Sequence, residues 1–130
     1  GVQIGSRFVA SQESSAHQNF KEKVLQTGDG GTLLTLKELT PVRLIKNEFF
    51  EQVKNAYEKD ASNEELAKLL GRGRAKKGMF EGDLVEGELE IGQVASIIDE
   101  IKSAKSIVEE IMLEFNEAKS ELLTDKYKFS

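Results

Sequence analysis

The sequence predicts a mainly α-helical chain that opens with one segment of α/β type. From about residue 13 onward, apolar residues recur at helical spacing behind Ser and Asn caps. Before them, a short apolar run from Val2 to Ile4 leads into Gly5-Ser6, a pattern typical of a buried strand that ends in a glycine turn. We therefore expect many helices and at most about three short strands.

The bulk composition limits the classes of protein that fit. A length of 130 residues favours one domain, and 38% hydrophobic residues allow a modest core. The net charge of −5 argues against a nucleic-acid partner and against an anionic membrane surface. The absence of cysteine excludes disulfides, a thiolate nucleophile and a Cys-based metal site, and is compatible with a cytoplasmic setting.

The first half of the chain predicts one strand, one helix, an extended piece and a second helix. Residues 1–8 predict a strand plus a turn, and residues 13–26 predict a helix with Ser11, Ser14 or Ser15 as its cap. A glycine-rich break follows at residues 28–31. Residues 32–39 are expected to be extended, and residues 43–59 are expected to form a helix. For the first turn of this helix, an extended conformation is the alternative.

The second half predicts short helices separated by glycines and one long helix at the end. Ser62 is the expected N-cap of a helix that ends at Gly71, with acidic residues in its first turn. Ser103 is the expected cap of the longest helix, which carries one apolar stripe. The expected segments are short helices at 72–80 and 92–101, a helical turn at 83–87, the long helix at 104–123 and a polar tail at 125–130.

The strongest candidate site is the turn at Gly5 and Ser6. In α/β proteins a strand that ends in Gly lets the backbone approach a phosphate, and free N–H groups and a hydroxyl then bind its oxygens. Gln3 would lie at the same edge of the sheet. From the residues alone, an ordinary strand that ends in a Gly-Ser turn is the commoner outcome.

Three other features have a structural and a functional interpretation. His17, the only histidine, is expected to be a packed or surface residue within a helix rather than a catalytic base. Residues 71–78 hold four cations in eight positions, which indicates a phosphate patch or, more commonly, a solvated helix face. Gly92 precedes Gln93 and is expected to permit a close contact between two elements.

Four stretches in the same order resemble one flavoenzyme family. These are residues 1–17 with GVQIGSRF and ESSAH, residues 40–47 with TPVRLIKN, residues 78–83 with GMFEGD, and residues 87–95 with the Gly-Gln pair. They resemble the nitronate monooxygenase (2-nitropropane dioxygenase) family, which includes FMN-dependent enoyl-acyl carrier protein reductase II. The likeness extends over about residues 1–123 and is strongest to the enoyl reductase branch.

The resemblance implies a (β/α)8 barrel, a fold that takes about 250 residues, so that this chain would form only its C-terminal part. Residues 1–27 would then hold the last barrel strand, the phosphate loop and its helix. Residues 28–102 would form a helical insertion or lid, and residues 103–130 the C-terminal helix and tail.

The resemblance also implies the cofactor and the reaction. FMN would be bound by Gln3, Ile4, Gly5 and Ser6, with Gln93 near the flavin, and NAD(P)H would serve as co-substrate. The family more often has Thr where Ser6 stands, and Ser keeps the hydroxyl. The reaction would be reduction of an acyl-carrier-bound enoyl thioester or oxidation of a small nitronate, and a homo-oligomer is compatible with either.

No catalytic residue is expected within this chain, because the resemblance implies that the catalytic histidine lies in the part of the barrel that precedes it. No metal ligand is expected either, because no histidine accompanies the glutamates of the last helix. The chain alone would therefore be inactive. Two other classes stay open at this point: a non-catalytic helical interaction domain, and a module that binds a phosphate ligand through residues 5–8 alone.

Overall fold

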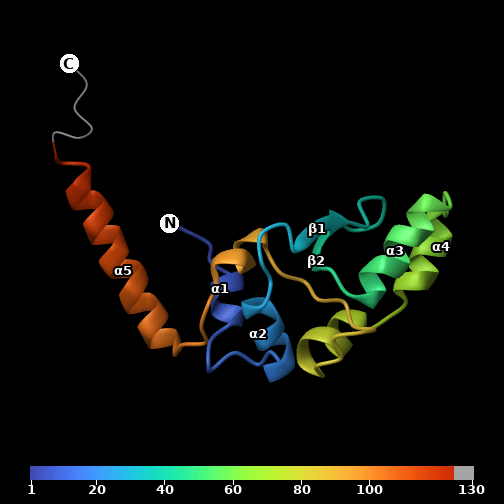
Figure 1. Ribbon diagram of the computed structural model, residues 1–130, viewed down its shortest axis with the longest axis horizontal. Coiled ribbons are helices and arrows are strands. Elements are labelled where there is room, and N and C mark those ends of the chain that lie inside the picture. The colour runs from blue at the N-terminus through green and yellow to red at the C-terminus, as the bar shows by residue number, and fades with distance from the viewer. Residues whose placement is uncertain (125–130) are drawn as a thin grey trace, which may run out of the picture.

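The computed structural model describes residues 1–124, and in them the chain is rich in helix with one pair of strands, as the sequence predicts (Figure 1). A closed barrel is not formed by these residues. In order along the chain the elements are α1 (Ser6–Val9), α2 (Gln18–Leu25), β1 (Thr32–Thr35), β2 (Val42–Ile45), α3 (Glu48–Glu58), α4 (Asn63–Leu70), the π-helical turn η1 (Lys76–Phe80), the 3₁₀-helix η2 (Gln93–Ile97) and α5 (Ala104–Glu121).

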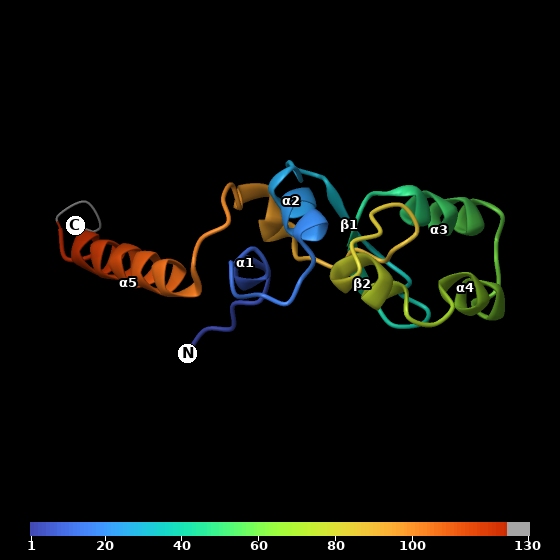
Figure 2. The same ribbon diagram turned by 90° about the horizontal axis from the view of Figure 1, so that it is seen from below.

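The elements are arranged along an elongated arc. In both views α1, α2 and η2 occupy the middle, α3 and α4 lie at one end beyond the strand pair, and α5 extends away at the other end (Figures 1 and 2). No helix among residues 1–124 combines the length and the apolar character that a membrane span needs.

The strand β2 joins two hydrophobic cores. Its neighbouring residues Leu44 and Ile45 are both buried but belong to different clusters, because successive side chains of a strand point to opposite faces. The first core includes Ala10, Phe20, Val24, Ile45, Leu89, Ile91, Ala95 and Ile98, and the second consists of Leu36, Leu44, Phe49, Phe50 and Val53. The two faces of β2 therefore contribute to both cores.

The strand predicted at residues 1–8 is wrong for this structure. Residues 1–5 have no regular structure, and a helical turn, α1, begins at Ser6 with Gly5 as its N-cap. A strand needs a hydrogen-bonded neighbour, and within residues 1–124 no segment pairs with this one. The side chain of Val2 is consequently 84% exposed.

Helix α2 begins later than predicted, and its cap is a residue that the sequence placed inside the helix. His17 is the N-cap, and its Nδ1 accepts a hydrogen bond from the backbone N–H of Asn19 at 3.1 Å. The preceding residues form a loop because the buried ammonium of Lys21 donates to the carbonyl oxygens of Ser11 (2.7 Å) and Ser14 (2.9 Å). Because Lys21 binds these carbonyls, the serines lie outside the helix.

Residues 43–59 follow the alternative that the sequence left open, with an extended first turn and then a helix. Asn47 separates the two, and its Oδ1 accepts a hydrogen bond from the N–H of Phe50 at 2.9 Å, which caps α3. Its Nδ2 donates to the carbonyl oxygens of Leu84 at 2.9 Å and Gly87 at 2.8 Å. Asn47 thus fixes the start of α3 and the loop at residues 84–87 together.

Helix α4 forms as predicted at both ends. The hydroxyl of Ser62 accepts a hydrogen bond from the N–H of Glu65, whose carboxylate accepts one from the Ser62 N–H, so that a complete capping box is present. The helix ends at Gly71, which has a φ of 63°. Both signals are local in sequence, which is why the pattern located them.

The cationic segment at residues 71–78 is only in part the solvated helix face that its composition predicts. The Arg74 guanidinium donates to the carbonyl oxygens of Leu70 at 2.9 Å and Glu86 at 2.7 Å, and it lies 4.4 Å from the ring centroid of Phe49. Lys76 and Lys77 form ion pairs with Glu81 and Asp83. Arg72 and Lys76 stay exposed, whereas Arg74 packs α4 against the loop after η1.

Two glycines allow this loop to fold back on itself. A Cβ atom on Gly87 would lie 2.2 Å from the Cα of Gly78, and one on Gly78 would lie 2.6 Å from the carbonyl oxygen of Glu88. Both neighbours are backbone atoms, so a side chain at either position has no flexible group to displace.

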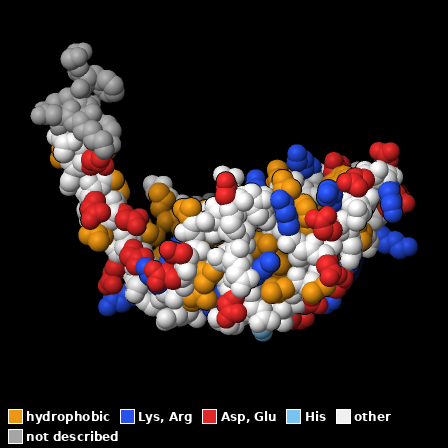
Figure 3. All heavy atoms as spheres, in the orientation of Figure 1, with side chains coloured by type: hydrophobic (Ala, Val, Ile, Leu, Met, Phe, Trp, Pro, Cys, Tyr) orange, Lys and Arg blue, Asp and Glu red, His pale blue; other side chains and the backbone are white. Residues whose placement is uncertain are grey.

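The last two helices are close to their predicted positions. The helix predicted at 92–101 is the shorter η2, and α5 is capped by Ser103, whose Oγ accepts from the N–H of Ser106 at 3.1 Å. Only Ile107 of the predicted α5 stripe is fully buried, whereas Met112 and Phe115 are more than half exposed. Figure 3 shows apolar side chains along α5 and at its junction with the body. The tail predicted at 125–130 lies outside the described residues.

The loop that follows η1 also gives a prediction for pH dependence. The backbone N–H of Glu86, then the side chain of Lys77 and the N–H of Val85, bind the carboxylate of Asp83 and lower its pKa from 3.8 to about 2. A carboxylate with a depressed pKa stabilises the fold fully above its unfolded pKa, and this contribution disappears as the pH falls from about 4 to about 2.

We expect Asp83→Asn to lower the free energy of unfolding at pH 5 and above, and we expect its difference from the wild type to shrink between pH 4 and pH 2. Urea unfolding at a series of pH values measures this difference. Asp29→Asn, at an exposed residue in another loop, is the matched control. A difference that stays constant from pH 5 to pH 2 would contradict the prediction.

Candidate functional site

The structure brings together two segments that the sequence singled out independently. The hydroxyl of Ser6 accepts a hydrogen bond from the backbone N–H of Gly92 at 3.0 Å, across 86 positions of sequence. A Cβ atom on Gly92 would lie 2.8 Å from that hydroxyl oxygen, so glycine permits this approach, as predicted for residue 92. Helix α1 and η2 are therefore joined at the start of each.

Beside this contact lies a cavity of about 490 Å³, which we call the Ser6 cavity. It is lined by parts of α1, β2 and the segment that leads into η2. The residues that matter for its chemistry are Gly5, Ser6, Pro41, Arg43, Glu90 and Gly92.

The Ser6 cavity has unused hydrogen-bond donors on its α1 side. The N-cap Gly5 has no side chain, and within the described residues no side chain caps the first turn of α1. The first N–H groups of a helix lack carbonyl partners within it, so those of Ser6 and Arg7 are available to an acceptor. Because Ser6 accepts from Gly92, its own hydroxyl hydrogen is also available.

Arg7 is directed elsewhere. Its Nη1 donates to the carbonyl oxygen of Glu100 at 3.1 Å, which ties α1 to the segment before α5. From the sequence, Arg7 has two possible roles, to face a phosphate or to form a salt bridge with an acidic residue of a helix. Among the described residues it forms neither contact and donates to a backbone carbonyl instead.

The carboxyl groups near the cavity differ in their burial. Glu88 is 6% exposed, and burial raises its pKa, with a further rise from the negative charge of Glu90 and an opposing effect of Arg74. Glu90 is half-buried and lines the Ser6 cavity. An anion bound there would be favoured by the N–H groups of α1 and opposed by this carboxylate.

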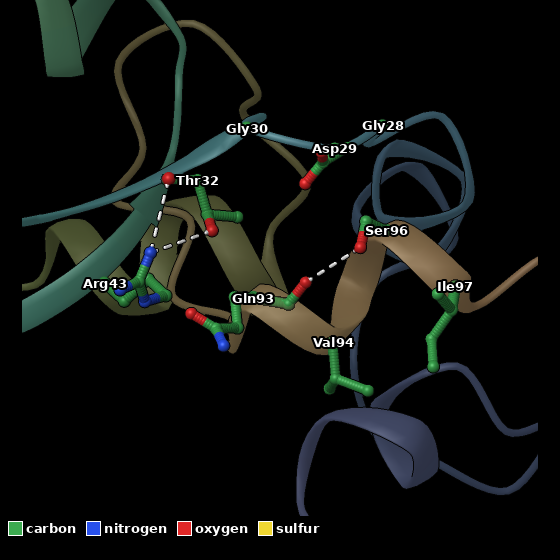
Figure 4. A pocket seen from close by; sticks show the side chains of 9 residues that line it. All are labelled: Gly28, Asp29, Gly30, Thr32, Arg43, Gln93, Val94, Ser96 and Ile97. Carbon is green, nitrogen blue, oxygen red and sulfur yellow. Dashed lines mark hydrogen bonds between the residues drawn. The ribbon is translucent and has the colours of Figure 1, made fainter.

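Gln93 lies in a second cavity, of about 440 Å³, which we call the Arg43 cavity (Figure 4). Its walls are the glycine-rich loop at 28–30, the strand residues Thr32 and Arg43, and η2. Arg43 lines both cavities, and Gln93 follows directly on Gly92, so the two cavities are neighbours.

The remaining predicted site residues do not line either cavity. Ile4 is 38% exposed and lies with Ile107 and Ile111 along a groove of about 300 Å³ between the N-terminus and α5. Gln3 is exposed in the same irregular segment. In the structure, Gly5 and Ser6 thus line the Ser6 cavity and Gln93 lines the neighbouring Arg43 cavity. Gln3 and Ile4 lie on the outer surface.

Two cavity residues were not identified as site candidates from the sequence. Arg43 belongs to the TPVRLIKN stretch, and Glu90 precedes the Gly-Gln pair. The only signal at Arg43 was a charged side chain in the middle of an apolar strand pattern, which is uncommon unless the charge has a partner or a ligand.

Most of the chain matches the sequence pattern of one protein family. Residues 1–114 match the nitronate monooxygenase family. A probable nitronate monooxygenase of Staphylococcus saprophyticus is 29% identical over 119 residues, which are 90% of this chain and 33% of that protein. The (3aS,4S,5R,7aS)-5-hydroxy-7a-methyl-1-oxo-octahydro-1H-indene-4-carboxyl-CoA dehydrogenase of Mycobacterium tuberculosis is 23% identical over 88% of this chain and 42% of that protein.

Solved structures agree with this match. Two structures of FabK from Thermotoga maritima, one of them a point mutant, superpose on this chain with TM-scores of 0.84 and 0.79 at 35% and 34% identity. Each covers 94% of this chain, which in turn covers 39% and 36% of those chains. The chain spans only a third to two fifths of the length of the relatives that it matches.

Proposed function

Because the chain belongs to the nitronate monooxygenase family, we propose that it is the C-terminal part of an FMN-dependent oxidoreductase and that Gly5 and Ser6 bind the flavin phosphate. The family is one of flavin-dependent oxidoreductases. The observation that carries the proposal is the contact between Ser6 and Gly92, which places two family motifs at one cavity.

The residues at this cavity fit a phosphate. A Cβ atom on Gly5 would meet nothing within 4 Å, so space is open in front of the first turn of α1. The backbone N–H groups of Ser6 and Arg7 and the hydroxyl hydrogen of Ser6 have no partner among the described residues. Such a set of donors at the start of a helix is a common phosphate site.

The other predicted flavin contacts are part of the same proposal. Gln3 and Ile4 directly precede the phosphate loop, and their exposed surface is available to the ribityl chain or to the neighbouring part of a barrel. Gln93, across the Gly92 contact, would lie towards the ring. We propose the division into residues 1–27, 28–102 and 103–130 on the same basis, as barrel end, lid and C-terminal helix.

We favour NAD(P)H-dependent reduction of an enoyl thioester over the other chemistry of the family. The chain is 35% identical to a FabK structure and 29% identical to a probable nitronate monooxygenase, and a third relative is named as a carboxyl-CoA dehydrogenase. The flavin, when bound, would carry the hydride, and the residues of this chain would position it through its phosphate. Oxidation of a small nitronate is the second candidate, supported by the match to residues 1–114.

We expect no turnover by the 130 residues alone, because they cover only 33–42% of the length of the curated relatives and the resemblance places the family's catalytic histidine outside them. The test therefore uses the complete protein that carries this chain. Its visible spectrum reports bound flavin, NAD(P)H oxidation with a crotonyl thioester reports the first reaction, and oxygen uptake with propyl nitronate reports the second. Consumption of NAD(P)H with the thioester supports the proposal. A purified protein that shows no flavin absorbance, even after incubation with FMN and removal of the free FMN, would refute it.

A further inference from the structure

The Arg43 cavity contains an arginine whose hydrogen-bonding capacity is mostly unused. The Nη1 of Arg43 donates to the carbonyl oxygen and the hydroxyl of Thr32, at 3.3 Å each (Figure 4). Within residues 1–124 its Nε and Nη2 have no partner. A guanidinium has five N–H donors in a planar fork, so this side chain is anchored on one side and open on the other.

The walls around Arg43 combine polar and apolar surface. The carboxamide of Gln93 faces the same cavity and makes no hydrogen bond to the described residues. Val94 and Ile97, from the same short helix, also line it and are 42% and 77% exposed. A ligand that fits these walls has an anionic group for Arg43, amides for Gln93 and an apolar portion for η2.

The other cations that drew attention in the sequence do not offer such a site. Arg74 is bound to backbone carbonyls and lies over Phe49, and Lys76 and Lys77 are each paired with a carboxylate. Arg43, by contrast with these three residues, combines a cavity, an anchored orientation and free donors.

We propose that the Arg43 cavity binds the phosphopantetheine arm of a thioester substrate, with Arg43 on its phosphate and Gln93 on one of its amides. The inference rests on the proposed function, since it names where the thioester would lie next to the flavin site. Arginine suits this role because its planar fork can bind two phosphate oxygens at once. Because Arg43 lines both cavities, this arm would lie beside the Ser6 cavity, where the flavin would be.

A negatively charged residue in the Arg43 cavity allows a second test of the proposal. Asp29 is an exposed carboxylate in the glycine-rich loop, which forms another part of the cavity wall (Figure 4). It opposes the binding of a phosphate and has no other partner among the described residues. Arg43→Gln and Asp29→Asn should therefore change phosphate affinity in opposite directions.

The experiment is a calorimetric titration of the flavin-loaded complete protein with 4′-phosphopantetheine and with pantetheine, which lacks the phosphate. We expect the wild type to prefer phosphopantetheine, Arg43→Gln to weaken that ligand about tenfold or more, and Asp29→Asn to tighten it about two- to threefold. Pantetheine affinity should stay within about twofold in all variants. Arg72→Gln, an exposed arginine outside the cavity, is the matched control and should bind as the wild type does.

Two results would overturn the inference: equal affinity of the wild type for the two ligands, or unchanged affinity in Arg43→Gln. If Arg43→Gln fails to fold, Asp29→Asn decides, and an unchanged affinity there overturns the inference. Tighter binding of coenzyme A than of phosphopantetheine would assign the arm to a CoA thioester, and equal binding would assign it to a carrier protein. Flavin content is read separately by absorbance, so a failure of the flavin proposal is recognised independently.

Discussion

Replacing Ser6 by Asp is expected to weaken FMN binding by the complete protein about ten- to hundredfold. The new carboxylate would face the phosphate and remove a hydroxyl donor, and charge-assisted contacts of this kind contribute about 1.5–3 kcal/mol. The carboxylate can still accept the hydrogen bond that the Gly92 N–H gives to Ser6. The fold around α1 should therefore survive while the phosphate is repelled.

Flavin fluorescence during titration measures this effect. Ser120→Asp introduces the same side chain on exposed α5 and is expected to bind FMN as the wild type does. Ser6→Thr keeps the hydroxyl and should also retain affinity. If Ser6→Asp binds FMN with unchanged affinity, Ser6 does not belong to the site.

Replacing Gly87 by Ala is expected to be strongly destabilising, at about 3 kcal/mol of the free energy of unfolding. Its Cβ would lie 2.2 Å from the Cα of Gly78 and 2.3 Å from the carbonyl oxygen of Asp83. Overpacking against backbone costs typically 1–3 kcal/mol or more, because the main chain must move. The segment that moves would be the loop that Arg74 and Asn47 hold in place.

Urea unfolding followed by circular dichroism measures this loss of stability. Gly28→Ala is the matched control, since a Cβ there would meet nothing within 4 Å and Gly28 is not among the positive-φ residues. We expect the control to stay within about 0.5 kcal/mol of the wild type. A Gly87→Ala protein as stable as this control would contradict the close packing of the two glycines.

Local signals in the sequence located the helices well. Ser62 with Glu65, Ser103 and Gly71 are all recognised from neighbours within a few positions, and the structure has each of them in its predicted role. The start of α2 was missed because the cap is His17, whose ring nitrogen accepts the hydrogen bond that a serine usually takes.

Contacts between distant residues could not be predicted in this way. The place of Arg74 over Phe49 depends on how α4 packs, and the same composition at residues 71–78 is typical of a solvated face. The strand at the N-terminus failed for a related reason, since an extended segment becomes a strand only through its partners.

The candidate site was predicted in part. The resemblance identified Gly5, Ser6 and Gln93, but only the structure shows that Gly92 joins the two segments and that Gln93 lines a separate cavity. Arg43 and Glu90 had no distinctive spacing, and their position at the cavities depends on the pairing of β2 with the segment that leads to η2.

The most direct test of the flavin-phosphate site compares two ligands and two proteins in one cycle. FMN and riboflavin differ only in the phosphate, and the wild type and Ser6→Asp differ only at the residue proposed to bind it. We predict that the complete wild-type protein binds FMN at least about tenfold more tightly than riboflavin and that Ser6→Asp removes this preference while riboflavin affinity stays within about twofold. An equal loss of affinity for both ligands, or an FMN preference that Ser6→Asp leaves intact, would show that the phosphate lies elsewhere.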